Sequence, residues 1–155
     1  MEQKTLSVSA IKDGTVIDHI SAGHALKIVR LLDLASHKQV VTIGLNLPSG
    51  SLGVKDIIKV AGKELSEEEA DRVAMFAPQG TVNIIKDFQV VKKFNTRLPS
   101  LITHIIVCPN PKCITNHENI ETKFKTIGNN GQLKLQCHYC EKIFLQSDIL
   151  EYKNN

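Results

Sequence analysis

Apolar residues in the first 94 positions follow two spacings, one typical of strands and the other of helices. Apolar residues that alternate with polar ones, the pattern of half-buried strands, occupy the segments 6–10, 15–20, 40–47, 56–60, 81–85 and 88–91. Helical spacing appears in 22–32, after Ser21 as the expected N-cap, and again after Ser66, where Glu67, Glu68 and Glu69 complete a capping box. Two helices among about six strands predict an α+β sandwich, with the helices on one face of a largely antiparallel sheet.

The periodicity breaks at residues 95–100, which contain no pair that must be buried. We expect a domain boundary there, giving domains 1–97 and 98–155. The second domain reads as β-structure, with a strand entering each of two cysteine pairs and a hairpin turn at 128–131. A segment of this size is only marginally stable alone, so it needs further stabilisation.

The chain has four cysteines, in two tight pairs: four residues separate Cys108 from Cys113, and two separate Cys137 from Cys140. Each pair can hold one ion from a single turn, and the connection between the pairs is long enough for a hairpin. This spacing predicts one tetrahedral zinc ion per chain, and four sulfur ligands leave no open position for catalysis. The alternative, two disulfides, requires an oxidising compartment.

The formal net charge of +3 suggests a nucleic-acid partner, but its distribution does not. Residues 98–155 carry six Lys and five Asp or Glu, and four thiolates with one divalent ion make that segment slightly acidic. No apolar run is long enough to span a bilayer, so we expect no membrane partner. No signal peptide is visible, so we expect a cytoplasmic location.

Five strings in this order resemble the regulatory chain of aspartate carbamoyltransferase. They are Ala10-Ile11-Lys12-x-Gly14-Thr15-Val16-Ile17-Asp18-His19-Ile20, Thr42-Ile43-Gly44-Leu45-Asn46-Leu47-Pro48-Ser49-Gly50, Ala77-Pro78-Gln79-x-Thr81-Val82-Asn83, Cys108-Pro109-Asn110-x-x-Cys113 and Cys137-x-Tyr139-Cys140-Glu141-Lys142. The resemblance implies a non-catalytic allosteric subunit of pyrimidine biosynthesis. It implies a ferredoxin-like N-terminal domain that binds nucleotides, and a zinc-ribbon, rubredoxin-like domain that docks on the catalytic chain.

The family resemblance also implies a nucleotide site without a P-loop. His19 and Lys93 resemble the phosphate ligands, Asp18 the ribose ligand, and Lys59 the residue that reaches base and ribose. The resemblance implies that the base is bound by Asn83 and by backbone groups at Ser9, Ala10, Ile11, Ile85, Phe88 and Val90. By charge alone Lys92 is a candidate too, although a solvated surface lysine is the simpler interpretation.

The partners implied by the resemblance are the catalytic chain, a second regulatory chain, and the nucleotides CTP and ATP, with UTP as a further candidate. Asn110, Glu141 and Lys142 resemble the contacts with the catalytic chain. Two residues depart from the family pattern: Phe88 stands at a tyrosine position and Lys112 at an amide position. The alternative function is a zinc-ribbon nucleic-acid-binding or transcription module. An enzyme is the least favoured interpretation, because no catalytic arrangement stands out and zinc would occupy every cysteine.

Overall fold

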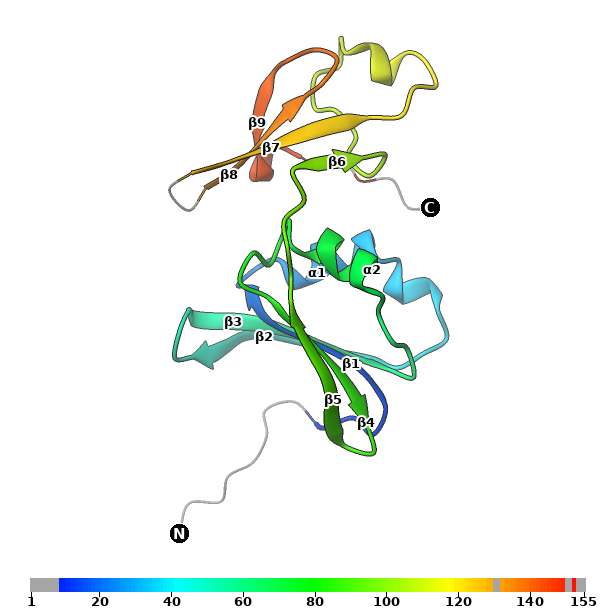
Figure 1. Cartoon of the computed structure of the whole chain (residues 1–155), viewed down its shortest axis with the longest axis vertical. Helices are drawn as coiled ribbons and strands as arrows, with labels where there is room; N and C mark the ends of the chain where they lie inside the picture. The colour runs from blue at the N-terminus through cyan, green and yellow to red at the C-terminus, as the bar shows by residue number, and fades with distance from the viewer. Residues whose placement is uncertain (1–8, 130–131, 150–151, 153–155) are drawn as a thin grey trace. The chain divides into compact units, whose positions relative to one another are not determined.

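The computed structural model of the chain describes residues 9–129, 132–149 and 152, which belong to two compact units, Met1–Arg97 and Leu98–Asn155 (Figure 1). Residues 6–8 of the expected first strand lie outside the described residues, and Ser9 and Ala10 are not in a strand.

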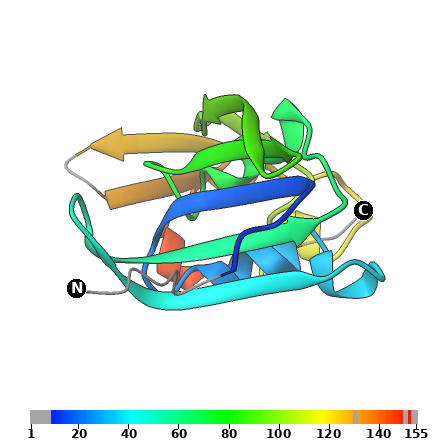
Figure 2. The ribbon, with the colours of Figure 1, turned by 90° about the horizontal axis from the view of Figure 1, so that it is seen from below.

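The N-terminal unit is an antiparallel sheet with strand order β2-β3-β1-β4-β5. Its elements are β1 (Gly14–Ser21), α1 (Ala25–Leu31), a short 3-10 turn η1 (Leu34–Ser36), β2 (Val41–Ser49), β3 (Gly53–Ala61), α2 (Glu67–Val73), β4 (Thr81–Lys86) and β5 (Gln89–Asn95). Both helices lie on the same face of this sheet (Figure 1), and Figure 2 shows the strands side by side. The first six main elements form the βαββαβ arrangement of ferredoxin-like folds, to which β5 adds a hairpin strand.

The residues that cover the helical face form the core of this unit. Ile17 and Ile20 in β1 and Ile58 in β3 have no exposed surface, and neither have Ile28 of α1 and Phe76 after α2. Strand alternation sends the residues between them to the opposite face, which neither helix covers. That opposite face is called the open face below.

Helix α2 follows the sequence prediction, and α1 departs from it. Ser66 and Glu69 form the expected capping box. Helix α1 begins at Ala25, after His24, so Ser21 is not its N-cap and instead ends β1. The N–H of Ala25, the first residue of α1, and that of Gly23 before the helix both donate to Asp56 of strand β3, a carboxylate with no exposed surface.

Asp56 bonds three backbone groups from two segments. Its Oδ2 accepts from the N–H of Gly23 at 3.0 Å and of Ala25 at 3.2 Å, and its Oδ1 accepts from the N–H of Asn46 at 3.0 Å. Buried carboxylates are stable only when such donors replace water. Asp56 therefore connects the start of α1 to strand β2.

Several strand boundaries also differ from those predicted. Strand β2 continues through Pro48 and β3 begins at Gly53, so both strands run beyond the predicted segments 40–47 and 56–60 and a short turn joins them. Strand β5 begins at Gln89, because Asp87 and Phe88 form the hairpin turn with φ angles of 51° and 64°. Two positive φ angles match the twist of the flanking strands.

The C-terminal unit is a four-stranded antiparallel sheet in the order β6-β7-β8-β9. The strands are β6 (Leu101–Thr103), β7 (Lys123–Asn129), β8 (Gln132–Cys137) and β9 (Ile143–Leu145), with 3-10 turns η2 (Ile114–Asn116) and η3 (Gln146–Asp148). Ile102, Phe124 and Leu135 are buried on one face. Strand register places Lys123, Lys125 and Lys134 together on the other. The innermost part of the predicted hairpin turn, 130–131, lies outside the described residues.

Replacing Asp56 tests its structural role. Hydrogen bonds to a charged group contribute about 1.5–3 kcal/mol each, so Asp56→Ala should lower the free energy of unfolding of the N-terminal unit by about 3 kcal/mol or more. Asp56→Asn should lower it less. Denaturant unfolding followed by circular dichroism measures both, with Glu64→Ala at an exposed carboxylate as the control. Equal stability of Asp56→Ala and the control would contradict this role.

Candidate metal centre and ligand-binding face

The four cysteine sulfurs converge at one point of the C-terminal unit. All four Sγ atoms lie within 4.8 Å of one another. The Sγ atoms of Cys108 and Cys140 are 3.8 Å apart, as are those of Cys113 and Cys137. Zinc–sulfur bonds of about 2.3 Å in a tetrahedron require sulfurs about 3.8 Å apart. The cluster therefore fits one zinc ion, and each close sulfur contact joins one sequence pair to the other.

The second pair is oriented by its own backbone. Cys137 ends strand β8, and its sulfur accepts hydrogen bonds from the N–H groups of Tyr139 and Cys140. The N–H of Glu141 donates to the carbonyl of Cys137 at 3.0 Å and closes the turn. Glu141 has a φ angle of 62°, which is uncommon for a residue other than glycine.

The first pair receives donors from the residues around it. The sulfur of Cys108 accepts from the N–H of Asn110, and that of Cys113 accepts from the backbone and the hydroxyl of Thr115, with Oγ1 at 3.2 Å. Burial raises the pKa of Cys108 and of Cys137. Burial also acts to raise the pKa of Cys113, but the hydrogen bonds from Thr115, together with those from the sulfurs of Cys137 and Cys108, outweigh it and lower that pKa to about 7.

The chemistry of the cluster follows from this burial. Three of the sulfurs are almost inaccessible, and uncompensated thiolates are costly there. A divalent cation supplies the compensating charge. Four sulfur ligands complete a tetrahedral shell, so this centre is structural and offers no position for a substrate.

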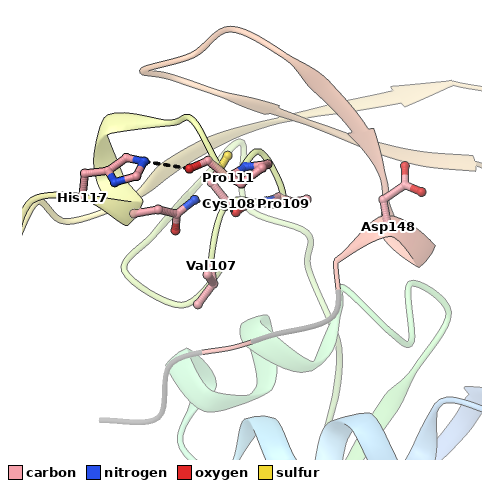
Figure 3. A pocket seen from close by; sticks show the side chains of 7 residues that line it. Val107, Cys108, Pro109, Pro111, His117 and Asp148 are labelled. Atoms are coloured by element: carbon pink, nitrogen blue, oxygen red, sulfur yellow. Dashed lines mark hydrogen bonds between the residues drawn. The ribbon is translucent and has the colours of Figure 1, made fainter.

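A cavity of about 430 Å³ opens beside the first cysteine pair. Figure 3 shows His117 and Pro111 at one side of it and Asp148 of η3 at the other. Its lining consists of Val107, Cys108, Pro109, Pro111, Asn116, His117 and Asp148.

The predicted contacts with a catalytic chain lie on the turns that carry the cysteines. Asn110 is partly exposed in the first turn, and Glu141 and Lys142 are exposed directly after the last cysteine. The side-chain Oδ1 of Asn110 accepts from the N–H of Lys112 at 3.1 Å.

In the N-terminal unit, strand register brings three of the predicted nucleotide ligands into one row. Val16 lies opposite Lys59 on one side and Asn83 on the other, and Asn83 lies opposite Lys93. Residues opposite one another share a face, and alternation along β1 puts Asp18 on that face with Val16. The row crosses the open face of the sheet.

His19 reaches the same region through a β-bulge. The register of β1 against β3 shifts between Ile17 and Ile20, and His19 has a φ angle of 58°. Its Nδ1 is 3.1 Å from the hydroxyl of Thr81, and its backbone N–H donates to Asp18 Oδ1 at 2.6 Å. Bulges commonly redirect a side chain in this way.

The charges on this face are already partly paired. Asp18 and Lys55 form an ion pair at 2.9 Å, and Lys59 Nζ donates to the carbonyl of Ser9 at 2.8 Å. Burial acts to raise the pKa of Asp18, but Lys55 and His19 more than offset this, so its pKa is lowered and it stays ionised at neutral pH. Burial lowers the pKa of Lys59, against the opposing charge of Asp18.

The residues implied for base recognition lie at one end of the open face. Ile85 is opposite Gly14 and Val90. The turn residue Phe88 donates its N–H to the carbonyl of Lys12 at 2.9 Å, next in sequence to Ser9, Ala10 and Ile11. Phe88 and Val90 are more than half exposed.

Two residues of this face were missed by the sequence analysis, and one candidate lies elsewhere. Lys55 shares the face of Lys59 because the two are four residues apart in one strand, a signal that the period of two offered. Thr81 gave no signal of its own. Lys92 faces the helices, with its Nζ 3.3 Å from Glu67 of α2, in agreement with the simpler interpretation of that lysine.

Comparisons with known proteins cover both units. The family model for the allosteric domain of aspartate carbamoyltransferase regulatory chains matches residues 6–97, and that for the metal-binding domain matches residues 100–150. A regulatory chain of Tolumonas auensis is 47% identical over 150 residues, 97% of each chain. That of Pyrococcus horikoshii is 51% identical over 147 residues, 94% of this chain and 96% of its own. That of Vibrio vulnificus is 44% identical over 150 residues, 97% of this chain and 98% of its own.

The described helices are too short and too polar to cross a membrane. Both family models match in chain order, and they agree with a sheet-and-helix unit followed by a four-cysteine unit. We conclude that this chain belongs to the family of aspartate carbamoyltransferase regulatory chains, which are non-catalytic subunits.

Proposed function

We propose that the chain binds nucleoside triphosphates, CTP and ATP in competition and UTP as a further effector, on the open face of its N-terminal sheet. The carrying observation is the row formed by Lys59, Asn83 and Lys93, with Asp18 on the same face and His19 redirected towards it. Together these residues offer cations, an amide and a carboxylate on the face of the sheet that lies opposite α1 and α2.

Each part of a nucleotide has a matching group in this arrangement. Lys93 and His19 supply charge-assisted bonds to phosphates, which replace a P-loop. Asp18 is ionised and accepts bonds from ribose hydroxyls. Lys59, with a pKa lowered by burial, gains from a nearby anion and also holds the carbonyl of Ser9, where the base-reading segment starts.

Regulation then requires that each nucleotide binds one state of the enzyme better than the other. Couplings of about 1–3 kcal/mol are typical of such effects. A nucleotide with equal affinity for both states would change nothing. We propose that CTP and ATP shift aspartate carbamoyltransferase in opposite directions through this one site, within the cytoplasmic synthesis of pyrimidines.

The two edges of the N-terminal sheet differ in a way that favours one dimer seam. Edge strand β5 carries Lys92 and Lys93, and lysines on an edge discourage pairing with another strand. Edge strand β2 has no charged side chain, and Leu45 within it and Val40 just before it are 48% and 70% exposed. We propose that two regulatory chains pair along β2.

The zinc unit is proposed to hold the catalytic chain through Asn110, Glu141 and Lys142. All three lie on the turns that carry the cysteine ligands, and a bound metal ion would fix the shape of both turns. Metal binding and docking are then coupled, because loss of the ion frees both turns.

Lys93→Ala should weaken CTP and ATP binding together, by about 1–3 kcal/mol for a lost charge-assisted bond. Lys92→Ala is a matched control, since the neighbouring lysine faces Glu67 instead. Isothermal calorimetry on the isolated chain measures both. If the two variants bound either nucleotide with the same affinity, Lys93 would not be a phosphate ligand.

Removal of zinc by a chelator should unfold the C-terminal unit and release the catalytic chain, while the N-terminal unit persists. Size-exclusion chromatography with co-expressed catalytic chain, together with calorimetric melting, follows the two events. Stripped protein that still bound the catalytic chain with undiminished affinity would refute the structural role of the metal.

Glu141→Gly separates stability from docking. Removing the side chain from a residue with positive φ should stabilise the zinc-loaded C-terminal unit by about 1 kcal/mol. It should also weaken binding to the catalytic chain, because the carboxylate is lost. Thermal melting and surface plasmon resonance test the two parts. Unchanged binding would remove Glu141 from the interface.

A further inference from the structure

Each of the two cysteine turns brings two sulfurs to the same point, but the turns differ in the number of residues between their cysteines. The turn from Cys137 to Cys140 has two intervening residues, and backbone N–H groups within it already bond the first sulfur. The turn from Cys108 to Cys113 has four. Because each added residue brings backbone freedom that must be lost before both sulfurs can bind one ion, the longer turn needs additional restraints.

Those restraints come from three consecutive side chains in and after turn η2. The hydroxyl of Thr115 lies 3.2 Å from Cys113 Sγ. The amide Nδ2 of Asn116 donates to two carbonyls, that of Cys108 at 3.0 Å and that of Asn110 at 2.7 Å. The ring Nε2 of His117 is 2.7 Å from the carbonyl of Pro111, the contact drawn as a dashed line in Figure 3.

We propose that Thr115 and Asn116 form an outer shell of the zinc centre. Thr115 is a positioning residue that orients the Cys113 sulfur and withdraws charge from it. Asn116 holds the turn in its ligand-ready shape before the metal binds.

The burial of Thr115 explains why its hydroxyl points to sulfur. Thr115 is 5% exposed and Cys113 is 2% exposed, so water cannot readily serve either group. When zinc is bound the sulfur has no proton, so the hydroxyl donates and the thiolate accepts. Such bonds reduce the excess negative charge of four thiolates around one dication, and outer-shell partners of this kind commonly set metal affinity.

Asn116 also connects this outer shell of the metal site to Asn110, a partly exposed residue of the same turn. Its amide bonds the carbonyl of Asn110, which also accepts from the N–H of Cys113 at 3.0 Å. Asn110 is a proposed contact with the catalytic chain, so this link to docking rests on the proposed function. The role of the two residues towards the metal does not.

The experiment compares Thr115→Val with Thr122→Val in the full chain. Thr122 is also a buried threonine of the same unit, but its hydroxyl donates to the carbonyl of Ile106 at 2.7 Å and not to sulfur. Zinc affinity is measured by competition with a chromogenic chelator. Cobalt is then substituted for zinc, and the sulfur-to-cobalt charge-transfer band reports the electron density on the sulfurs.

Thr115→Val should lose about 10- to 100-fold in zinc affinity and shift the cobalt band. Thr115→Ser should restore both values, and Thr122→Val should leave the band in place. Asn116→Ala should weaken zinc binding without moving the band, since its amide bonds carbonyls. If Thr115→Val does not fold with saturating zinc, Thr115→Ala takes its place in the same comparison.

Wild-type affinity and an unshifted band in the variant that lacks the Thr115 hydroxyl would overturn the proposal for Thr115. So would equal losses of affinity in that variant and Thr122→Val without a band shift, because the effect would then be general destabilisation. Unchanged zinc affinity in Asn116→Ala would overturn the role of Asn116. These measurements use neither nucleotide nor catalytic chain, so they stay decisive if the proposed function fails.

Discussion

The pairing of strand β1 with β3 on one side and β4 on the other determines what each face of the N-terminal unit can do. Its register places Ile17 and Ile20 under the helices, and places Asp18 with Lys59 and Asn83 on the opposite side. A shift of one residue would exchange these sets and bury charges in the core. The bulge at His19 interrupts the alternation once, so the two neighbours Asp18 and His19 can both reach the open face.

The C-terminal unit depends on a different constraint, the confinement of four sulfurs within 4.8 Å of one another. Its apolar core is small, with Phe124 and Leu135 among the few large side chains that are fully buried. The ion therefore replaces the hydrophobic stabilisation that a larger domain would have. Because the ligands come from both ends of the unit, the same ion also fixes the two turns that carry the proposed contacts with the catalytic chain.

Local signals were sufficient for part of this structure. The Ser66 capping box predicted α2 and the cysteine pairs predicted the metal cluster. In each case the interacting groups are close in sequence or belong to a residue type, cysteine, that strongly indicates a metal site.

The start of α1 was predicted wrongly. The N–H of its first residue, Ala25, donates to Asp56, which follows Ala25 by 31 residues and is brought to the helix by strand pairing, so no pattern near Ser21 reveals this contact. Lys134 lies in a different strand from Lys123 and Lys125, yet strand register places all three on one face. The resemblance supplied the proposed nucleotide ligands. The sequence analysis missed Lys55, although the period of two in β3 places it on the same face as Lys59. Nothing in the sequence marked Thr115, whose role depends on the fold of one tight turn.

The order of the two units along the chain has a consequence for synthesis. All the strands and helices of the N-terminal unit precede the first cysteine, and the fourth cysteine follows the first by 32 residues. Domains generally fold as they are made, N-terminal first. A growing chain therefore forms its open face before its cysteines bind zinc. For a period its N-terminal unit is folded, while its C-terminal unit still needs a metal ion in order to fold. A cell short of zinc would accumulate chains in that condition, with a formed sheet and no ordered turns.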